Sequence, residues 1–262
     1  MIKKIFLLLL VGVPLLAFNK TVTYEVSFSI FGTMAKVEMT KVIDKQNYVI
    51  CIRAYTVGVV SGLTKGREET YISQGKIVDG AFLPDVFVKT RKTDDSEKVT
   101  VYRFDHDVKT VMKEHASSEI TVTRKLDIKS LKTIRSTHEE YEVTPQSKEL
   151  YARNDLISFI FNSPKNLSDV KCGEVAKFTA VAVKTDKSEI FLELPCSEEK
   201  IANVTQQMRD DETVFDILLK KKFFKGGEGK LVIALADDGF PSVAVMNDVV
   251  FFGDVVGSRS QE

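Results

Sequence analysis

The fold of this chain is decided by the stretch Val22-Thr-Tyr-Glu-Val-Ser-Phe-Ser-Ile30, in which every second residue is apolar. Polar residues stand between the apolar ones, which is the pattern of a β-strand with one buried and one solvated face. The turn Phe31-Gly-Thr33 follows, and the alternation continues at Ala35, Val37 and Met39. The sequence therefore predicts that the chain opens with an antiparallel hairpin.

Similar alternating runs, separated by short polar turns, recur along most of the chain. They amount to about 12 to 14 strands, with one or two short helices between them. Because the strands follow one another as hairpins, neighbours are antiparallel, and few of the long connections of a sandwich are visible. The sequence therefore predicts a mainly β fold, with one large, strongly curved antiparallel sheet shaped as a half-barrel or an open barrel.

The strongest helix pattern spans residues 154–161. Asn154 can accept hydrogen bonds from free amides of the first turn, and Asp155 complements the helix dipole there. Pro164 is expected to end this helix, whose apolar side chains would lie on the sheet. We expect a single exported domain over residues 18–262, with an internal seam near residues 144–170. Residues 56–64 are interpreted as a short helix or a buried corner.

The first 17 residues have the composition of a secretory signal peptide. Lys3 and Lys4 precede an apolar run from Ile5 to Leu16, and the small residue Ala17 follows. The run is about a dozen residues long, whereas a membrane-spanning helix needs about 20. We therefore expect export, cleavage near Ala17 and a periplasmic location. No later apolar run is long enough to predict a transmembrane segment in the mature chain.

The charges of the chain balance, with 37 basic and 37 acidic residues. Loss of Lys3 and Lys4 with a signal peptide would leave a small acidic excess. Nucleic-acid binding rests on an excess of Lys and Arg over phosphates, so no nucleic-acid partner is expected.

The chain has three cysteines. Cys51 stands in a strand-like run, which favours a buried apolar thiol. Cys172 and Cys196 flank two consecutive strand patterns, so they could meet at one end of a hairpin. An oxidising compartment permits a disulfide between them, and the pattern leaves both the bonded and the free state open.

The sequence contains partial matches to several catalytic motifs, and each match lacks residues that the motif requires. Gly226-Gly-Glu-Gly229-Lys230 lacks the first glycine and the final hydroxyl residue of a phosphate-binding loop. Gly58-Val-Val-Ser-Gly62 has Val60 where a nucleophile elbow has serine. Asp105-His106-Asp107 fits a hairpin turn, with His106 pointing to solvent, better than a metal site. We therefore expect a protein that is not an enzyme, with no metal and no cofactor.

Aromatic residues are plentiful, with 17 Phe and 7 Tyr. Most of them must fill the core. A curved sheet with a helix in its concavity can also leave an apolar groove for a lipid tail or acyl chain. The candidates for lining such a groove, with core filling as the alternative for each, are Phe159, Phe161, Phe223 and Phe224.

Several short motifs stand in a recognisable order: Gly66-Arg-Glu-Glu-Thr-Tyr-Ile-Ser73, Gly75-Lys-Ile77, Tyr102-Arg-Phe-Asp105, Asn154-Asp-Leu156 and Asp248-Val-Val-Phe-Phe-Gly-Asp254. This order resembles a family of exported bacterial proteins, domain of unknown function 3108. The resemblance implies a β-rich, half-barrel-like envelope protein, comparable to periplasmic lipoprotein carriers. It supplies no catalytic residues.

Two functions are expected from these observations. The first is a non-enzymatic periplasmic protein of the cell envelope that binds a lipid-like or apolar ligand in its curved sheet. The alternative is a structural or adaptor component of an envelope machine, such as a secretion or motility complex, because edge strands can pair with a partner protein.

Overall fold

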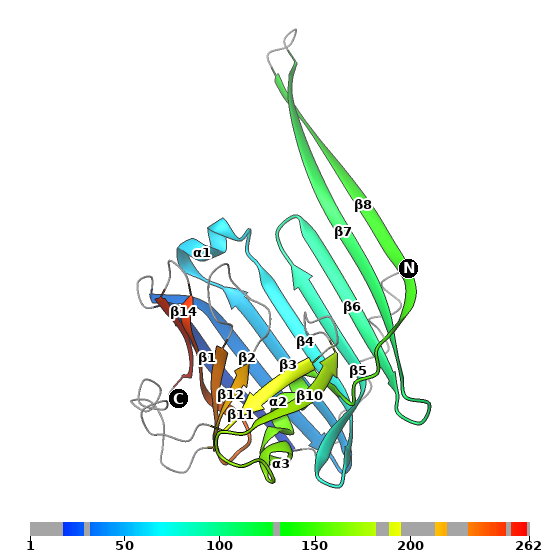
Figure 1. The fold of residues 1–262 in the computed structure, drawn as a ribbon. Helices are drawn as coiled ribbons and strands as arrows, with labels where there is room; N and C mark the ends of the chain where they lie inside the picture. The colour runs from blue at the N-terminus through cyan, green and yellow to red at the C-terminus, as the bar shows by residue number, and fades with distance from the viewer. Residues whose placement is uncertain are drawn as a thin grey trace.

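The structure is a computed structural model, and it describes residues 18–28, 32–127, 132–181, 189–194, 213–218, 230–249 and 253–260. Figure 1 shows a mainly β molecule from which one long hairpin projects. The strands of the first half are β1 (Phe18–Phe28), β2 (Gly32–Asp44), β3 (Asn47–Thr56), β4 (Glu68–Val78), β5 (Ala81–Lys92), β6 (Ser96–Asp105), β7 (Thr110–Asp127) and β8 (Lys132–Glu149).

The second half adds shorter strands and a helical segment. Its strands are β9 (Asn154–Asp155), β10 (Val175–Val181), β11 (Glu189–Glu193), β12 (Thr213–Leu218), β13 (Lys230–Leu235), β14 (Pro241–Val249) and β15 (Gly253–Arg259). The described part of the chain holds three short helices, α1 (Gly58–Leu63), α2 (Leu156–Phe161) and α3 (Ser163–Leu167).

Fifteen described strands form one sheet in the order β8-β7-β6-β5-β4-β3-β2-β1-β15-β14-β13-β12-β11-β10-β9. The two halves join where β1 pairs antiparallel with β15, with Tyr24 opposite Arg259. β9 pairs parallel with β10, but the long strands are antiparallel throughout. The sheet ends at β8 and β9, so it stays open. The predicted large, open and curved antiparallel sheet is confirmed.

Residues 150–153 join the two strands at the ends of the sheet, and the internal seam expected near residues 144–170 stays a prediction. β8 and β9 follow one another along the chain, yet they stand at opposite ends of the strand order. The sheet therefore curves, and α2 contacts β4 and β5 on one side and β10 on the other. In Figure 1 the strands β10 and β11 lie in front of the middle of the sheet, whereas β6 to β8 extend beyond them.

The alternating pattern that begins at Val22 forms the predicted half-buried strand β1. Val22 and Tyr24 of β1 are buried, whereas Thr21, Thr23 and Glu25 between them are exposed. β1 pairs with β2 in a hairpin, in which Val22 lies opposite Met39. The apolar face of this hairpin belongs to the core between the two halves of the sheet.

The short helix α2 fills the concavity of the sheet. Ile157 and Phe161 belong to a buried cluster with Tyr48, Ile50 and Phe87 from the first half. Phe159 belongs to a second cluster, which includes Ile190, Leu192, Ile233 and Leu235 from the second half. The helix therefore joins the two halves through different faces, as expected for an apolar helix laid into a curved sheet.

The ends of α2 differ from the sequence-based expectation. The N-cap is Asp155, not Asn154: its carboxylate accepts hydrogen bonds from the backbone amides of Ile157 at 2.7 Å and Ser158 at 2.9 Å. The Asn154 side chain instead accepts a hydrogen bond from the amide of Asn162 at 2.9 Å. Pro164 stands in the first turn of α3, where proline is tolerated because no amide hydrogen is needed there.

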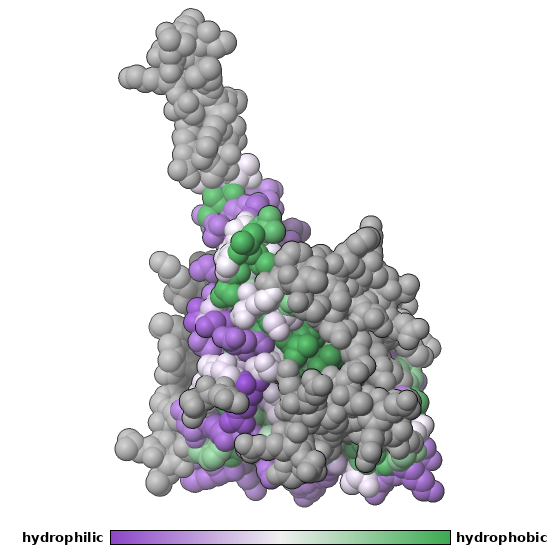
Figure 2. Space-filling view, turned by 90° about the vertical axis from the view of Figure 1, so that its left-hand side faces the viewer, coloured by the Kyte–Doolittle hydropathy of each residue, from purple (hydrophilic) through white to green (hydrophobic). Residues whose placement is uncertain are grey.

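The segment at residues 56–64 forms the exposed helix α1. None of its residues is buried, and Val59 and Leu63 are 83% and 80% exposed. Figure 2 views the molecule from the side on which α1 lies in Figure 1, and hydrophobic residues reach the surface there below the projecting hairpin. Of the two expectations for this segment, the short helix is confirmed and the buried corner is wrong.

Candidate functional site

A groove lies across β5, β6, β7 and β8. It has a volume of about 510 Å³, within the range of about 300 to 1,000 Å³ that is usual for ligand sites. Its lining residues are Lys89, Arg91, Lys98, Thr100, Tyr102, Lys113, His115, Thr144, Pro145 and Ser147.

The groove lies on the face of the sheet that also carries the core. On β5, Lys89 and Arg91 follow Phe87 at every second position, so all three side chains share one face. Phe87 is fully buried in the cluster that α2 covers. The inward face of β5 therefore changes from apolar to cationic where it leaves the core, and the groove begins at this change.

Aromatic rings form the border between core and groove. Phe87 stacks on Tyr71 with a centroid distance of 6.4 Å, and its ring lies 6.0 Å from that of Tyr102. The Lys89 ammonium lies 5.3 Å from the centroid of Tyr71, and the Lys113 ammonium 6.0 Å from that of Tyr102. These distances suit weak cation–π attraction. The groove thus combines cations with an aromatic base.

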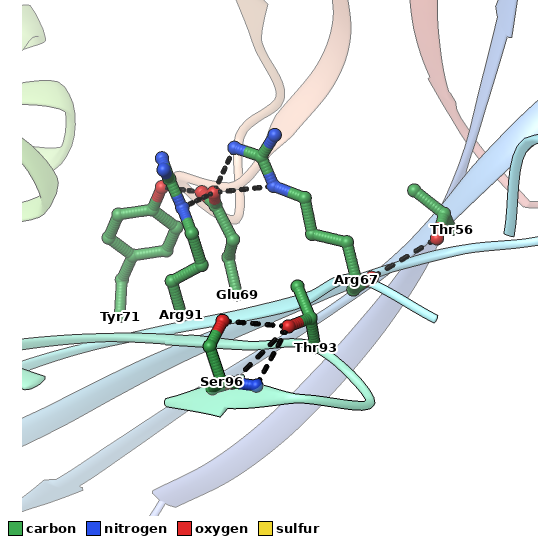
Figure 3. A network of polar contacts seen from close by, with 7 residues as sticks. All are labelled: Thr56, Arg67, Glu69, Tyr71, Arg91, Thr93 and Ser96. Carbon is green, nitrogen blue, oxygen red and sulfur yellow. Dashed lines mark hydrogen bonds and ion pairs between the residues drawn. The ribbon is translucent and has the colours of Figure 1, made fainter. Parts of the chain in front are cut away.

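Figure 3 shows how Arg91 is held at the groove. Its Nε donates to Glu69 at 2.8 Å, and the same carboxylate accepts hydrogen bonds from Arg67 and from the Tyr71 hydroxyl. Burial raises the pKa of Glu69, but these hydrogen bonds and the charges of both arginines outweigh burial and lower it to about 2. Glu69 is therefore a permanent anion that orients two guanidinium groups and leaves the cluster with a net positive charge.

The outer wall of the groove is the edge strand β8. The register of β7 and β8 shifts between Lys113 and His115, and Pro145 stands in β8 at this irregularity. Proline is confined to edges and bulges of sheets because it cannot donate a ladder hydrogen bond. Lys113 reaches Glu149 of β8 at 3.5 Å, and His115 Nδ1 shares a 2.9 Å hydrogen bond with Thr100.

Phe159 and Phe161 are not among the described residues that line this groove. Phe159 is fully buried and its ring lies 5.8 Å from Phe178. Phe161 contacts the rings of Phe82 and Phe240, each at 5.7 Å. Phe223 and Phe224 lie outside the described residues. A direct role of these four residues in ligand binding stays a prediction.

Of the three cysteines, Cys51 and Cys172 lie among the described residues and Cys196 does not. Cys51 is a free, half-buried thiol on β3, and burial raises its pKa, as suits an inert structural thiol. Cys172 lies in the turn before β10, whereas Cys196 lies outside the described residues. The disulfide between Cys172 and Cys196 stays a prediction.

His106 stands in the turn between β6 and β7, as expected, but it does not point to solvent. Nε2 lies 2.7 Å from the carbonyl oxygen of Pro84, and Nδ1 lies 2.9 Å from the Tyr151 hydroxyl. The ring also stacks on Phe104. His106 therefore fastens the segment after β8 to the sheet, an assignment that a local reading of Asp105-His106-Asp107 could not make.

Two further features are absent from the described residues. These residues contain no group of three or more His, Cys, Asp or Glu side chains that could hold a metal ion. Among the helices described, none has the length and apolar character needed to cross a membrane.

The fold and the groove define a β-rich protein with an open curved sheet and a cationic cleft on its inner face. Residues 23–146, just under half of the chain, match the family described as "Protein of unknown function (DUF3108)", and this match confirms the resemblance inferred from the motifs. No curated protein and no solved structure matches the chain. The matched range contains every described residue that lines the groove except Ser147.

Proposed function

We propose that this protein is a non-enzymatic, exported protein of the periplasm that binds a lipid-like ligand on the concave face of its curved sheet. The observation that carries the proposal is the groove on β5 to β8, which opens directly from the aromatic border of the core. Export is proposed from residues 1–17, which have the composition of a signal peptide.

The structure of the groove suits an amphiphile better than a wholly polar ligand. Tyr71 and Tyr102 offer ring surface beside the buried Phe87, and Pro145 adds an apolar wall from β8. Ligand sites typically combine such apolar lining with a few placed polar groups. Here the lysines, threonines and His115 are those polar groups.

Binding can be measured with a fluorescent fatty-acid probe, and native mass spectrometry after gentle purification can detect co-purified lipid. Thr144 lines the groove, whereas the neighbouring Val143 points to the other face of the same edge strand. We expect Thr144→Trp to occlude the groove and weaken probe binding by about tenfold or more, because the bulky ring occupies ligand volume. Val143→Trp is the matched control and should bind like the wild type.

Absence of co-purified lipid together with absence of probe binding to the wild type would exclude the lipid-carrier function. Equal effects of Thr144→Trp and Val143→Trp would place binding elsewhere on the molecule.

A second candidate function is that of an adaptor in an envelope machine, and it is favoured by the hairpin of β7 and β8. β6 pairs with β7 only as far as Glu119, and beyond it β7 pairs with β8 alone. The hairpin therefore projects from the body (Figure 1), and β8 is an edge strand with Tyr141 and Val143 exposed. An unpaired strand edge can bind a partner by strand addition.

Site-specific photocrosslinking from Tyr141 in intact cells tests the adaptor function. A reproducible adduct with one envelope protein would support it. A monodisperse monomer that forms no adduct from Tyr141 would count against it. A photocrosslinker at the exposed Val108, in the turn at the other end of β7, serves as the control position.

A further inference from the structure

The charges of the groove say which ligands it would select. Of the ten described residues that line the groove, four are lysine or arginine, and none is aspartate or glutamate. The chain as a whole has equal numbers of basic and acidic residues. The positive charge of the groove therefore reflects a local clustering of cations, because the chain as a whole has no excess of basic residues.

Two like charges face each other directly in the groove. Arg91 on β5 lies opposite Lys98 on β6 in the strand register. Like charges at directly opposed positions destabilise a sheet. One position further along, on the other face of the same two strands, Lys92 lies opposite Glu97, a pair of opposite charges. On the outer face the two opposed residues therefore carry opposite charges, whereas in the groove they carry like charges.

The described carboxylates compensate the groove only in part. Glu69 pairs with Arg91, but it serves Arg67 as well. Glu149 lies 3.5 Å from Lys113. Lys98 is exposed and has no ion-pair partner among the described residues. On β7 it lies opposite Ser117, and Ser117 in turn lies opposite Glu142 on β8. An anion placed between Arg91 and Lys98 would offset the repulsion between their charges.

We propose that the groove selects amphiphiles with an anionic phosphate headgroup, which binds between Arg91 and Lys98 with Lys89 beside them. This inference rests on the proposed function, because it adds headgroup selectivity to lipid binding. The hydroxyls of Thr100 and Thr144 line the same groove and can donate to phosphate oxygens. The apolar part of the ligand lies along Tyr102 and Pro145.

The phosphate group that binds in the groove could belong to a lipid headgroup or to free inorganic phosphate. Three probes distinguish these two sources. They are dihexanoyl phosphatidic acid and dihexanoyl phosphatidylcholine, both below their micelle concentrations, and inorganic phosphate. Isothermal titration of each into the full-length mature protein gives the affinities. We expect phosphatidic acid to bind about tenfold or more tightly than phosphatidylcholine, because its phosphate monoester carries more negative charge and no choline ammonium, which Arg91 and Lys98 would repel.

Lys98→Gln is the diagnostic variant, because Lys98 is exposed and its loss should leave the fold intact. It should weaken phosphatidic acid binding by about tenfold and phosphatidylcholine binding by a clearly smaller factor, because the choline ammonium offsets the charge of that phosphate. Lys98→Glu should abolish or reverse the preference. Lys92→Gln removes the same charge from the other face of the sheet and is the matched control, expected to bind both lipids like the wild type.

The outcomes separate the two proposals. Equal affinity for both lipids, unaffected by Lys98→Gln, would overturn headgroup selectivity while lipid binding stands. Failure of both lipids to bind would overturn lipid binding and the selectivity with it. Inorganic phosphate that binds as tightly as phosphatidic acid would show a free-anion site and overturn the headgroup assignment.

Discussion

The hydroxyl of Ser73 on β4 donates a 2.6 Å hydrogen bond to the carboxylate of Asp155, although 82 residues separate the two. Both side chains are fully buried. Because Ser73 uses its proton on Asp155, the Tyr48 hydroxyl donates to Ser73, at 3.0 Å. Asp155 also caps α2. This contact therefore fastens the helix in the concavity to the first half of the sheet.

Removal of this carboxylate should destabilise the whole domain. Asp155→Ala deletes a helix cap, worth about 0.5–2 kcal/mol, and leaves buried donors unsatisfied at about 1–3 kcal/mol each. We expect a loss of about 3 kcal/mol in the free energy of unfolding, measured by urea denaturation. Asp107→Ala, in the exposed turn between β6 and β7, should change it by less than about 0.5 kcal/mol. Equal stabilities of the two variants would contradict the role of Asp155.

The stability should also carry a specific pH dependence. Burial raises the pKa of Asp155 to about 6, against the hydrogen bonds from Ser73 and from the amides of residues 158 and 157, which lower it. Between about pH 4 and 6 the folded state holds the proton more tightly than the unfolded state, so this group stabilises less as pH rises through that window. Asp155→Asn lacks the titration. The wild type should therefore lose stability relative to Asp155→Asn from pH 4 to 6, and parallel curves would refute the assignment.

Glu69 should show the opposite pH dependence. Its side chain is only 15% exposed, and its pKa is lowered to about 2, so its contribution is complete above about pH 4.5 and is lost as pH falls toward 2. At pH 7, Glu69→Gln should cost about 1–3 kcal/mol, because Arg67 and Arg91 lose their shared partner. Glu68→Gln affects only the more exposed pair with Arg53 and should cost at most about 1 kcal/mol. Urea denaturation at several pH values measures both; a similar cost for the two variants would contradict the network.

A close approach of two backbones explains one glycine of the family-like motifs. A Cβ at Gly75 would lie 2.0 Å from the carbonyl oxygen of Leu83, where the register of β4 and β5 shifts. Gly75→Ala must displace one strand, so we expect it to destabilise by more than about 3 kcal/mol. Gly62→Ala, in α1 with no atom within 4 Å of its Cβ, should stabilise by up to about 1 kcal/mol. Thermal denaturation of both variants measures the contrast, and a mild effect at Gly75 would refute the close approach.

Local patterns were sufficient for much of the fold. The alternation at Val22 and Tyr24 predicted β1 and its buried face, and the apolar run at 156–161 predicted a helix on the sheet. These features depend on residues that are close together in the sequence, so local patterns are enough to predict them. The open, curved sheet followed from the many hairpins.

Long-range features were not accessible in the same way. The pairing of β1 with β15 joins the two ends of the described chain, and no local pattern records it. The groove gathers residues from 89 to 147, so it exists only once β5 to β8 are paired. One signal was present: Lys89 and Arg91 stand in phase with Phe87, at positions where a strand that is buried on that face would carry apolar residues.

Photocrosslinking with a phosphatidic acid that carries a diazirine in its acyl chain, followed by peptide mapping of the adducts, tests most directly whether the groove is the ligand site. Lipid binding in the groove predicts adducts on β6 and β8, near Tyr102 and Pro145, that disappear in Thr144→Trp and persist in Val143→Trp. Adducts confined to the exposed apolar helix α1, or adducts that Thr144→Trp leaves unchanged, would contradict it.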